Sequence, residues 1–279
     1  MEKESLLAET KSLLSHADLR ARKRLGQHFL IDGSVQKQIL SAAKLTAEDT
    51  VLEVGPGLGI MTRELARKVR RVIAVELDDK LAAFLKQQMT SFPNITIINE
   101  DILKLDPTAL LPEPEPYKLV ANLPYYITSP VLRHFLEAAA KPDLMVVMVQ
   151  KEVAEVIAAG PGKRSLLSIS VQFYGRPSVI TRVPASAFYP SPEVDSAILR
   201  IDLYPKPAVA VDNADSFFET VRAGFANPRK QLANSLSHGL GISKTDVSQL
   251  LGEAGIAPQR RAETLTLEEW AQLWRAQTK

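Results

Sequence analysis

Short apolar runs alternate with segments of helical periodicity through the first hundred residues of the chain. Residues 51–54, 71–75 and 95–98 are nearly continuous runs of β-branched and other apolar residues, short enough to be strands. Residues 60–69 and 79–89 follow the first two runs and repeat their apolar positions every three or four residues, as amphipathic helices do. Apolar strands separated by helices are typical of a parallel sheet buried on both faces. The pattern therefore predicts a doubly wound α/β fold.

The remainder of the chain divides into two regions of different pattern. Further strands are expected at 118–121, 144–149, 166–173 and 196–203, with helices at 2–16, 34–43 (capped by Ser34) and 152–159. The stretch 107–116 holds four prolines and predicts a surface loop. After residue 205 the periodicity is helical, at 214–225, 229–238, 244–254 and 267–276. We expect one domain at 1–205 and a small all-α domain at 206–279.

Composition narrows the possible chemistry. The 279 residues contain no cysteine, which excludes disulfides, thiolate zinc sites and cysteine nucleophiles. The four histidines lack the spacing of metal ligands, and no apolar run is long enough for a membrane span. The first residues lack the basic and then apolar order of a secretory signal. We expect a cytoplasmic monomer that binds neither a metal nor a membrane.

Basic residues are clustered although the net charge is only +2. Arginine and lysine gather at 20–24, 163–164, 222–230 and 260–261. Local basic patches suit a polyanionic partner such as a nucleic acid. For any one cluster taken alone, a solvated surface is an equally good interpretation.

The turn after the first predicted strand carries three alternating glycines, Gly55, Gly57 and Gly59, preceded by Glu53. Glycine lets the backbone take positive φ and approach a ligand closely. The spacing G-x-G-x-G resembles motif I of class I S-adenosylmethionine methyltransferases and differs from the dinucleotide fingerprint G-x-G-x-x-G. A nicotinamide-binding loop and a tight turn without a ligand remain the alternatives.

Polar residues follow the strands expected on either side of this turn. Glu76 comes after the run at 71–75, Asp101 after the run at 95–98, and Asn122 after the run at 118–121. Ligands of open α/β sheets bind outside the carboxyl ends of the strands, so these side chains and that of Glu53 are expected around one crevice. Any one acid taken alone is also explained as a helix cap.

Asn122-Leu123-Pro124-Tyr125 resembles tetrapeptides of methyltransferases that modify exocyclic amino groups. Hydrogen bonds from an adenine N6 group to the Asn122 side-chain oxygen and to the Leu123 carbonyl would favour a more nucleophilic nitrogen, and positioning would supply most of the rate. A base drawn out of its stack needs aromatic faces, for which Tyr125 and Phe188 are the candidates. Either ring could instead pack in the core.

Five motifs together carry a resemblance to a known family. They are Gly26-Gln27-His28-Phe29-Leu30, the run from Glu53 to Gly59, Asn122-Leu123-Pro124-Tyr125, Gln150-Lys151-Glu152-Val153-Ala154 and Phe188-x-Pro190-x-Pro192-x-Val194-x-Ser196. In this order they closely resemble the ribosomal RNA adenine N6,N6-dimethyltransferase family, over nearly the whole chain. The resemblance implies a class I S-adenosylmethionine methyltransferase with a Rossmann-like, mostly parallel, seven-stranded sheet and a C-terminal helical domain that binds RNA or the ribosome.

The resemblance also implies a substrate and a set of site residues. The expected reaction is dimethylation of two adjacent adenines in the 3′-terminal hairpin loop of 16S rRNA during small-subunit maturation, with S-adenosylmethionine as donor. Glu76 would bind the ribose hydroxyls, Asp101 the adenine amine, and Asn122 both the methionine end and the target amine. The remaining residues expected at the donor are Gln27, His28, Leu30, Gly55, Gly57, Leu77 and Ile102. The family more often has asparagine at the position of His28.

Two alternatives of function remain open at this point. The erythromycin-resistance 23S rRNA methyltransferases share the first and fourth of the five motifs. Ala223-Gly224-Phe225 followed by Asn227 to Leu232 resembles the 16S branch more closely. A non-catalytic ribosome-assembly or transcription factor of the same fold is the alternative from another class, against which the intact Gly55, Glu76 and Asn122 argue.

Overall fold

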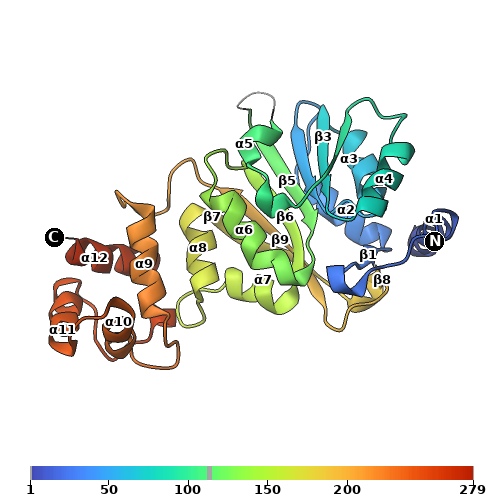
Figure 1. Cartoon of the computed structure of the whole chain (residues 1–279). Helices are drawn as coiled ribbons and strands as arrows, with labels where there is room; N and C mark the ends of the chain where they lie inside the picture. The colour runs from blue at the N-terminus through green and yellow to red at the C-terminus, as the bar shows by residue number, and fades with distance from the viewer. Residues whose placement is uncertain (1, 112–114, 279) are drawn as a thin grey trace. The chain divides into compact units, whose positions relative to one another are not determined.

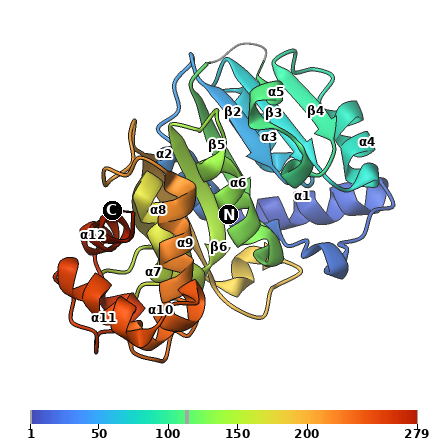
Figure 2. The same cartoon turned by 60° about the vertical axis from the view of Figure 1, so that its left-hand side comes forward.

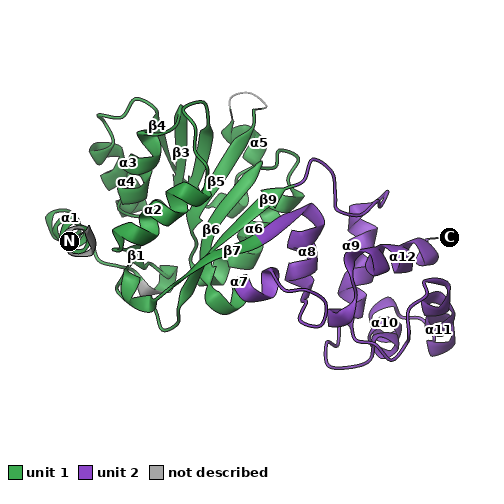
Figure 3. Cartoon of the chain, turned by 180° about the vertical axis from the view of Figure 1, so that it is seen from behind, with its two compact units in different colours: residues 1–154, 178–203 green, residues 155–177, 204–279 purple. Residues whose placement is uncertain are grey.

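A computed structural model describes residues 2–111 and 115–278. Contacts between residues group the chain into two compact units (Figure 3). The first unit comprises Met1–Ala154 and Ser178–Leu203, and the second comprises Glu155–Pro177 and Tyr204–Lys279. The units therefore do not follow the order of the sequence, and the division at residue 205 stays a prediction about domains.

The first unit is built on a seven-stranded sheet with the order β4-β3-β2-β5-β6-β9-β7 (Figure 1). Its strands are β2 (Thr50–Val54), β3 (Arg71–Glu76), β4 (Ile95–Asn99), β5 (Tyr117–Asn122), β6 (Leu144–Gln150), β7 (Gly175–Val183) and β9 (Ser196–Leu203). Strands β2 to β6 are parallel, and β9 runs antiparallel to β6. The strand order reverses at β2, which places a ligand-binding crevice at the carboxyl ends of β2 and β5.

Helices cover both faces of this sheet. They are α2 (Gly33–Ala42), α3 (Ile60–Ala66), α4 (Asp79–Gln88), α5 (Pro107–Leu110), α6 (Thr128–Glu137) and α7 (Lys151–Ile157), the last of which runs into the second unit. Val51, Val120 and Val146 point to one face and pack with Ile39 of α2 and Leu65 of α3. Figures 1 and 3, which view opposite sides, show α2 on one face and α6 on the other. Burial on both faces explains why the strand sequences are continuously apolar.

Two further elements lie beside the carboxyl ends of the strands. A two-stranded ribbon pairs β1 (Phe29–Leu30) antiparallel with β8 (Phe188–Tyr189). Helix α1 (Glu2–His16) lies below α4 in Figure 2 and packs Leu14 against Phe29, Leu58 and Leu81. The N-terminal segment is thus part of the packed unit through its apolar residues.

The second unit is all helical apart from the start of β7. Its helices are α8 (Leu166–Tyr174), α9 (Ala214–Gly224), α10 (Leu232–Leu240), α11 (Lys244–Glu253) and α12 (Leu267–Gln277). Phe173, Phe217 and Trp270 are fully buried in its core. Gly239 permits the close crossing of α9 and α10, because a Cβ there would lie 2.7 Å from the Cβ of Ala223. The helices predicted after residue 205 are confirmed in the residues described.

Several local predictions were wrong. The strand predicted at 166–173 is helix α8, which begins with a capping box between Ser165 and Ser168. Apolar residues alternate in this segment with Ser168, Ser170 and Gln172, which is the period-two pattern of a half-buried strand, and the strand that was missed is β7. The cap of α2 is Asp32, which accepts from the Ser34 N–H, and not Ser34 itself. The expected loop at 107–116 opens with helix α5, and residues 112–114 of that loop lie outside the described part of the chain.

Candidate functional site

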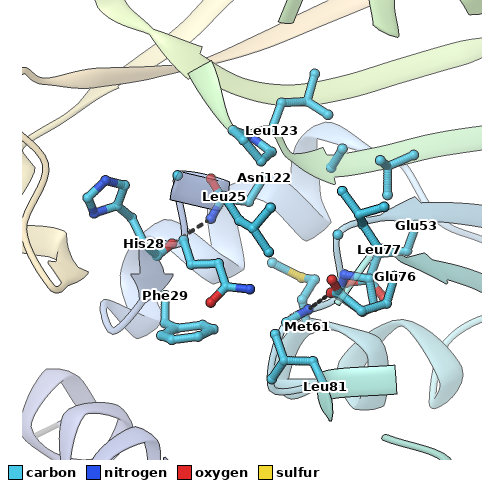
Figure 4. Close-up of a pocket in the computed structure, with 18 of the residues that line it drawn as sticks. Leu25, His28, Phe29, Glu53, Met61, Glu76, Leu77, Leu81, Asn122 and Leu123 are labelled. Atoms are coloured by element: carbon cyan, nitrogen blue, oxygen red, sulfur yellow. Dashed lines mark hydrogen bonds between the residues drawn. The ribbon is translucent and has the colours of Figure 1, made fainter. Parts of the chain in front are cut away.

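A cavity of about 360 Å³ opens at the carboxyl ends of β2, β3 and β5. Every residue that the sequence singled out for the site lines it: Gln27, His28, Leu30, Gly55, Gly57, Glu76, Leu77, Asp101, Ile102, Asn122, Leu123, Tyr125 and Phe188. Figure 4 shows His28 and Asn122 at one side of the cavity, and Glu53, Glu76 and Leu77 at the other. The structure therefore brings the set together, while the role of each residue stays a prediction.

The three glycines of the turn serve different physical needs. Gly55, Gly57 and Gly59 all have positive φ, between 59° and 76°. A Cβ built on Gly55 would come no closer than 3.9 Å to the Asn122 carbonyl oxygen, so the space beside it is open. A Cβ on Gly57 would press on the Phe29 ring at 3.2 Å, and one on Gly59 would collide with the side chain of Met89. The first glycine borders the cavity, and the third permits close packing of helices.

Glu76 is a buried carboxylate held by the backbone. Its Oε2 accepts from the Gly57 N–H at 3.1 Å, and its Oε1 accepts from the Asp78 N–H at 2.9 Å. Burial raises the pKa of Glu76 above its usual value, and the two N–H donors act in the opposite direction. Each oxygen retains capacity for a further hydrogen bond, so the group can still accept from a ligand.

Glu53 lies at the end of β2 and is only 3% exposed, yet it lines the cavity. Its Oε2 has no hydrogen-bond partner among the described residues, and neither does the buried hydroxyl of Thr62. Burial raises the pKa of Glu53 to about 8, with the nearby Thr62 lowering it and the charge of Glu76 adding to the rise. A buried polar oxygen without a partner beside a cavity favours a ligand that forms a hydrogen bond there.

Asn122 is the last residue of β5, and a hydrogen bond fixes the orientation of its side-chain amide. Its Nδ2 donates to the His28 carbonyl oxygen at 3.0 Å, which leaves Oδ1 as its acceptor atom. His28 Nδ1 donates in turn to the Pro190 carbonyl oxygen at 2.7 Å. The His28 ring lies nearly parallel to that of Tyr125, with 6.3 Å between ring centroids. Asn122 is thus fixed through a residue far away in the sequence.

The aromatic candidates differ in exposure. Tyr125 is partly buried, its hydroxyl lies 2.9 Å from the Ser196 hydroxyl, and burial raises its pKa above the usual value. Phe188 is 3% exposed and packs in the core beneath the sheet face that α2 and α3 cover, although it also borders the cavity. The adjacent Tyr126 is 57% exposed at the cavity wall. Tyr126 is therefore a further aromatic candidate, and its position directly after Tyr125 in the motif was a signal for it.

Asp101 lines the cavity two residues beyond the end of β4. Its Oδ1 accepts from the Leu103 N–H at 3.0 Å, so the side chain caps the short turn that contains Ile102. The cap interpretation and the ligand interpretation of this acid are therefore compatible, because the second oxygen is not required for the turn.

Sequence reasoning missed Asp78 and Arg22, which meet beside the cavity. Arg22 Nε lies 3.1 Å from Asp78 Oδ2, and the Gln27 Nε2 donates to the same oxygen at 3.1 Å. Little in the sequence indicated this contact, because an acidic residue just before a predicted helix is explained as the cap of that helix. Asp78 does cap α4, and its second oxygen reaches the N-terminal segment.

Neither a metal site nor a membrane span is found in residues 2–111 and 115–278. No group of three or more His, Asp or Glu side chains is arranged there to hold a metal ion. None of the helices in these ranges combines the length and apolar character needed to cross a bilayer.

Comparison with known proteins gives consistent matches along the chain. The model of the family described as "Ribosomal RNA adenine dimethylase" matches residues 18–277. The "Ribosomal RNA small subunit methyltransferase A" of Dehalococcoides mccartyi is 56% identical over 96% of this chain and 92% of its own length. The crystal structure of the 23S rRNA methyltransferase ErmE is 29% identical, with a TM-score of 0.71 over 90% of this chain and all of that one.

A third likeness bears on the fold alone. A dimethyladenosine transferase from Plasmodium falciparum is 24% identical, with a TM-score of 0.75 over 88% of this chain and 96% of that one. The α/β methyltransferase fold expected from the sequence is confirmed by these neighbours and by the seven-stranded sheet. The match along nearly the whole length, with the site motifs gathered at one cavity, shows that the chain belongs to the ribosomal RNA adenine dimethylase family.

Proposed function

We propose that this chain dimethylates the N6 amino groups of two adjacent adenines in the 3′-terminal hairpin loop of 16S rRNA, with S-adenosylmethionine as the methyl donor. The observation that carries the proposal is the 56% identity over 96% of the chain to a protein named for small-subunit RNA methylation. The reaction would take place in the cytoplasm during maturation of the small ribosomal subunit. A monomeric state remains an expectation from the sequence.

The residues at the cavity fit this donor. When bound, S-adenosylmethionine supplies a methyl group that its positive sulfonium makes electrophilic. The Oε2 atom of Glu53 has no partner among the described residues and suits a ligand that forms a hydrogen bond there, and the open space beside Gly55 admits a ligand close to the backbone. Glu76 would accept from the ribose hydroxyls and Asp101 from the adenine amine. Gln27, His28, Leu30, Gly57, Leu77 and Ile102 would complete the donor site.

Asn122 would act on the target amine. Because its Nδ2 is occupied by the His28 carbonyl, its Oδ1 is the atom available to accept from an adenine N6 hydrogen. A second hydrogen bond to the Leu123 carbonyl would draw the nitrogen away from conjugation with the ring. No strong base is needed, since the extra proton can leave to solvent after transfer, and the rate then depends on positioning.

Aromatic side chains would hold the extruded base. Tyr125, fixed through Ser196, presents a ring at the cavity, and the exposed Tyr126 offers a second face beside it. Phe188 is the other ring expected from the sequence, and it would contact the base only through the part that borders the cavity. Stacking on such rings offsets the loss of stacking within the RNA.

Methylation of a 23S rRNA adenine is the second candidate, because the ErmE structure superposes on 90% of the chain. Incubating the purified protein with S-adenosylmethionine and either immature 30S particles or 23S rRNA, followed by mass mapping of methyladenine, tests both. We expect dimethyladenine at two neighbouring positions of the 16S hairpin. Modification of 23S rRNA alone would support the second candidate, and donor binding without any transfer would support a non-catalytic assembly factor.

A further inference from the structure

Asp78 divides its carboxylate between two parts of the first unit. Its Oδ1 accepts from the Lys80 N–H at 3.0 Å and thereby caps α4. Its Oδ2 accepts from Gln27 Nε2 and faces Arg22 Nε, each at 3.1 Å. Asp78 is 3% exposed, whereas a third of the Arg22 side chain is exposed. One oxygen therefore caps helix α4, and the other binds the N-terminal segment at residues 22–30 through Arg22 and Gln27.

That segment forms one wall of the cavity. Residues 25–30 line the cavity. Both polar atoms of the Gln27 side-chain amide form hydrogen bonds, because Nε2 donates to Asp78 and Oε1 accepts from the Arg22 N–H at 2.8 Å. Beyond Gln27, the wall is held by the hydrogen bond between Asn122 and the His28 carbonyl and by the β1–β8 ribbon. Residues 25–30 are thus held by Asp78 on the side of the cavity near Glu76 and by Asn122 on the opposite side.

The burial of Asp78 makes this fastening strong. Exposed ion pairs contribute little, because solvent screens them and the side chains lose entropy. A buried carboxylate is different, since removal of its partners leaves a charge without compensation. Asp78 is also tied to the expected ribose-binding group, because its own N–H donates to Glu76 Oε1 at 2.9 Å. A displacement of the wall and a displacement of Glu76 are therefore linked.

We propose that Asp78 is a positioning residue for the methyl donor: through Oδ2 it fixes Arg22 and Gln27, and so holds residues 25–30 in place as the wall of the donor cavity. The inference rests on the proposed function in taking S-adenosylmethionine as the ligand. Asp78 does not line the cavity itself and acts through these two side chains.

The substitution Asp78→Asn separates the two duties of the residue. An asparagine oxygen can still cap α4, while its NH₂ group replaces the oxygen that accepts from Gln27 and pairs with Arg22. Asp79→Asn is the matched control, because Asp79 is the next residue, is exposed and makes the same change of charge. Calorimetry should show S-adenosylmethionine binding about tenfold weaker in Asp78→Asn and unchanged in Asp79→Asn.

Kinetics distinguish positioning from general loss of structure. We expect Asp78→Asn to raise the KM for the donor while kcat at saturating donor stays within about twofold of the parent. Arg22→Gln, a change at a partly exposed side chain, should weaken donor binding in the same direction. The double variant should bind the methyl donor no more weakly than Asp78→Asn alone, because Arg22→Gln breaks only the contact with Asp78 that Asp78→Asn has already removed.

Protease sensitivity gives a readout that does not require the donor. Trypsin should cleave within residues 20–24 faster in Asp78→Asn than in the parent or in Asp79→Asn, since the segment is released. Equal donor affinities in Asp78→Asn and the parent would overturn the proposal. If the parent itself does not bind S-adenosylmethionine, the proposed function is rejected, and equal trypsin rates would then overturn the role of Asp78 separately.

Discussion

The carboxyl ends of β3 and β5 border the same cavity but are held in different ways. At the end of β3, Glu76 accepts from the backbone N–H groups of Gly57 and Asp78, which lie 19 and 2 residues away in the sequence. At the end of β5, Asn122 and Tyr125 depend on His28 and Ser196, which lie 94 and 71 residues away. The first end is made within one stretch of chain, from the turn after β2 through α3 and β3 to the start of α4, and the second requires distant loops to come together.

This difference separates two kinds of failure. The N–H groups that hold Glu76 belong to the backbone and are not removed by a side-chain substitution, so a substitution at the β3 end should affect the binding of the methyl donor and little else. Side chains that orient one another across loops lose their geometry together, so a substitution at the β5 end should affect the reacting atoms. The following experiments test this separation.

The largest effect is expected at Asn122. Asn122→Ala removes both the anchor to the His28 carbonyl and the acceptor for the target amine. Single-turnover methyl transfer with saturating donor and RNA should slow by about 10²- to 10³-fold, because the lost interaction matters chiefly in the transition state. RNA affinity, measured by filter binding, should change far less. A variant that transfers methyl at the parental rate would remove the β5 end from the mechanism.

A smaller effect is expected at Glu76. Glu76→Ala removes a carboxylate expected to bind a ribose diol, and donor affinity should fall by about 10- to 100-fold, as the loss of a hydrogen-bonded charge predicts. The rate at saturating donor should be affected less than in Asn122→Ala. Glu76→Gln, which keeps one acceptor, should lie between the parent and the alanine variant in calorimetry. Unchanged donor affinity in Glu76→Ala would reject the assignment of the ribose site.

The third prediction concerns stability at the β2 end, where Glu53 lacks the donors that Glu76 has. Its folded-state pKa of about 8 lies above the unfolded value of 4.5, so the folded state holds its proton longer and loses stability as pH rises between these values. Glu53→Gln stays neutral and escapes this loss. Urea denaturation should show a gain in the free energy of unfolding that grows from near zero at pH 4.5 to on the order of 4 kcal/mol at pH 8. A gain independent of pH would show that Glu53 ionises normally.

Much of the fold was predictable because its strands carry a strong signal. The strands at 51–54 and 71–75 were found from apolar runs, since both are buried on the two faces of the sheet, and the edge strand at 95–98 was found from its three isoleucines although it is only partly buried. Periodicity failed at 166–173, where apolar residues alternate with Ser168, Ser170 and Gln172 as in a strand although the segment is helix α8. Strand β7 was missed because it is partly exposed and begins in a Gly-Arg-Pro sequence that reads as a turn.

The site was predictable as a location and less so as a set of contacts. Glu76, Asp101 and Asn122 could be placed at one crevice because each follows a parallel strand. The hydrogen bond from Asn122 to the His28 carbonyl and the meeting of Asp78 with Arg22 could not, because each depends on how the N-terminal segment lies across the strand ends. Periodicity carries no information about such contacts.

The interleaved second unit has a consequence for how this protein can be rearranged at the level of its gene. Helix α8, at residues 166–174, is separated from α9 by β7 and β9, yet Ile169 and Phe173 share a core with Phe217 and Phe218. A single recombination junction near residue 205 would therefore replace helices α9 to α12 with those of another protein while keeping the original α8, which packs against them. Exchange between related proteins requires two junctions, one on each side of 155–177, in addition to the one near 204. The helical unit is thus inherited together with the catalytic sheet.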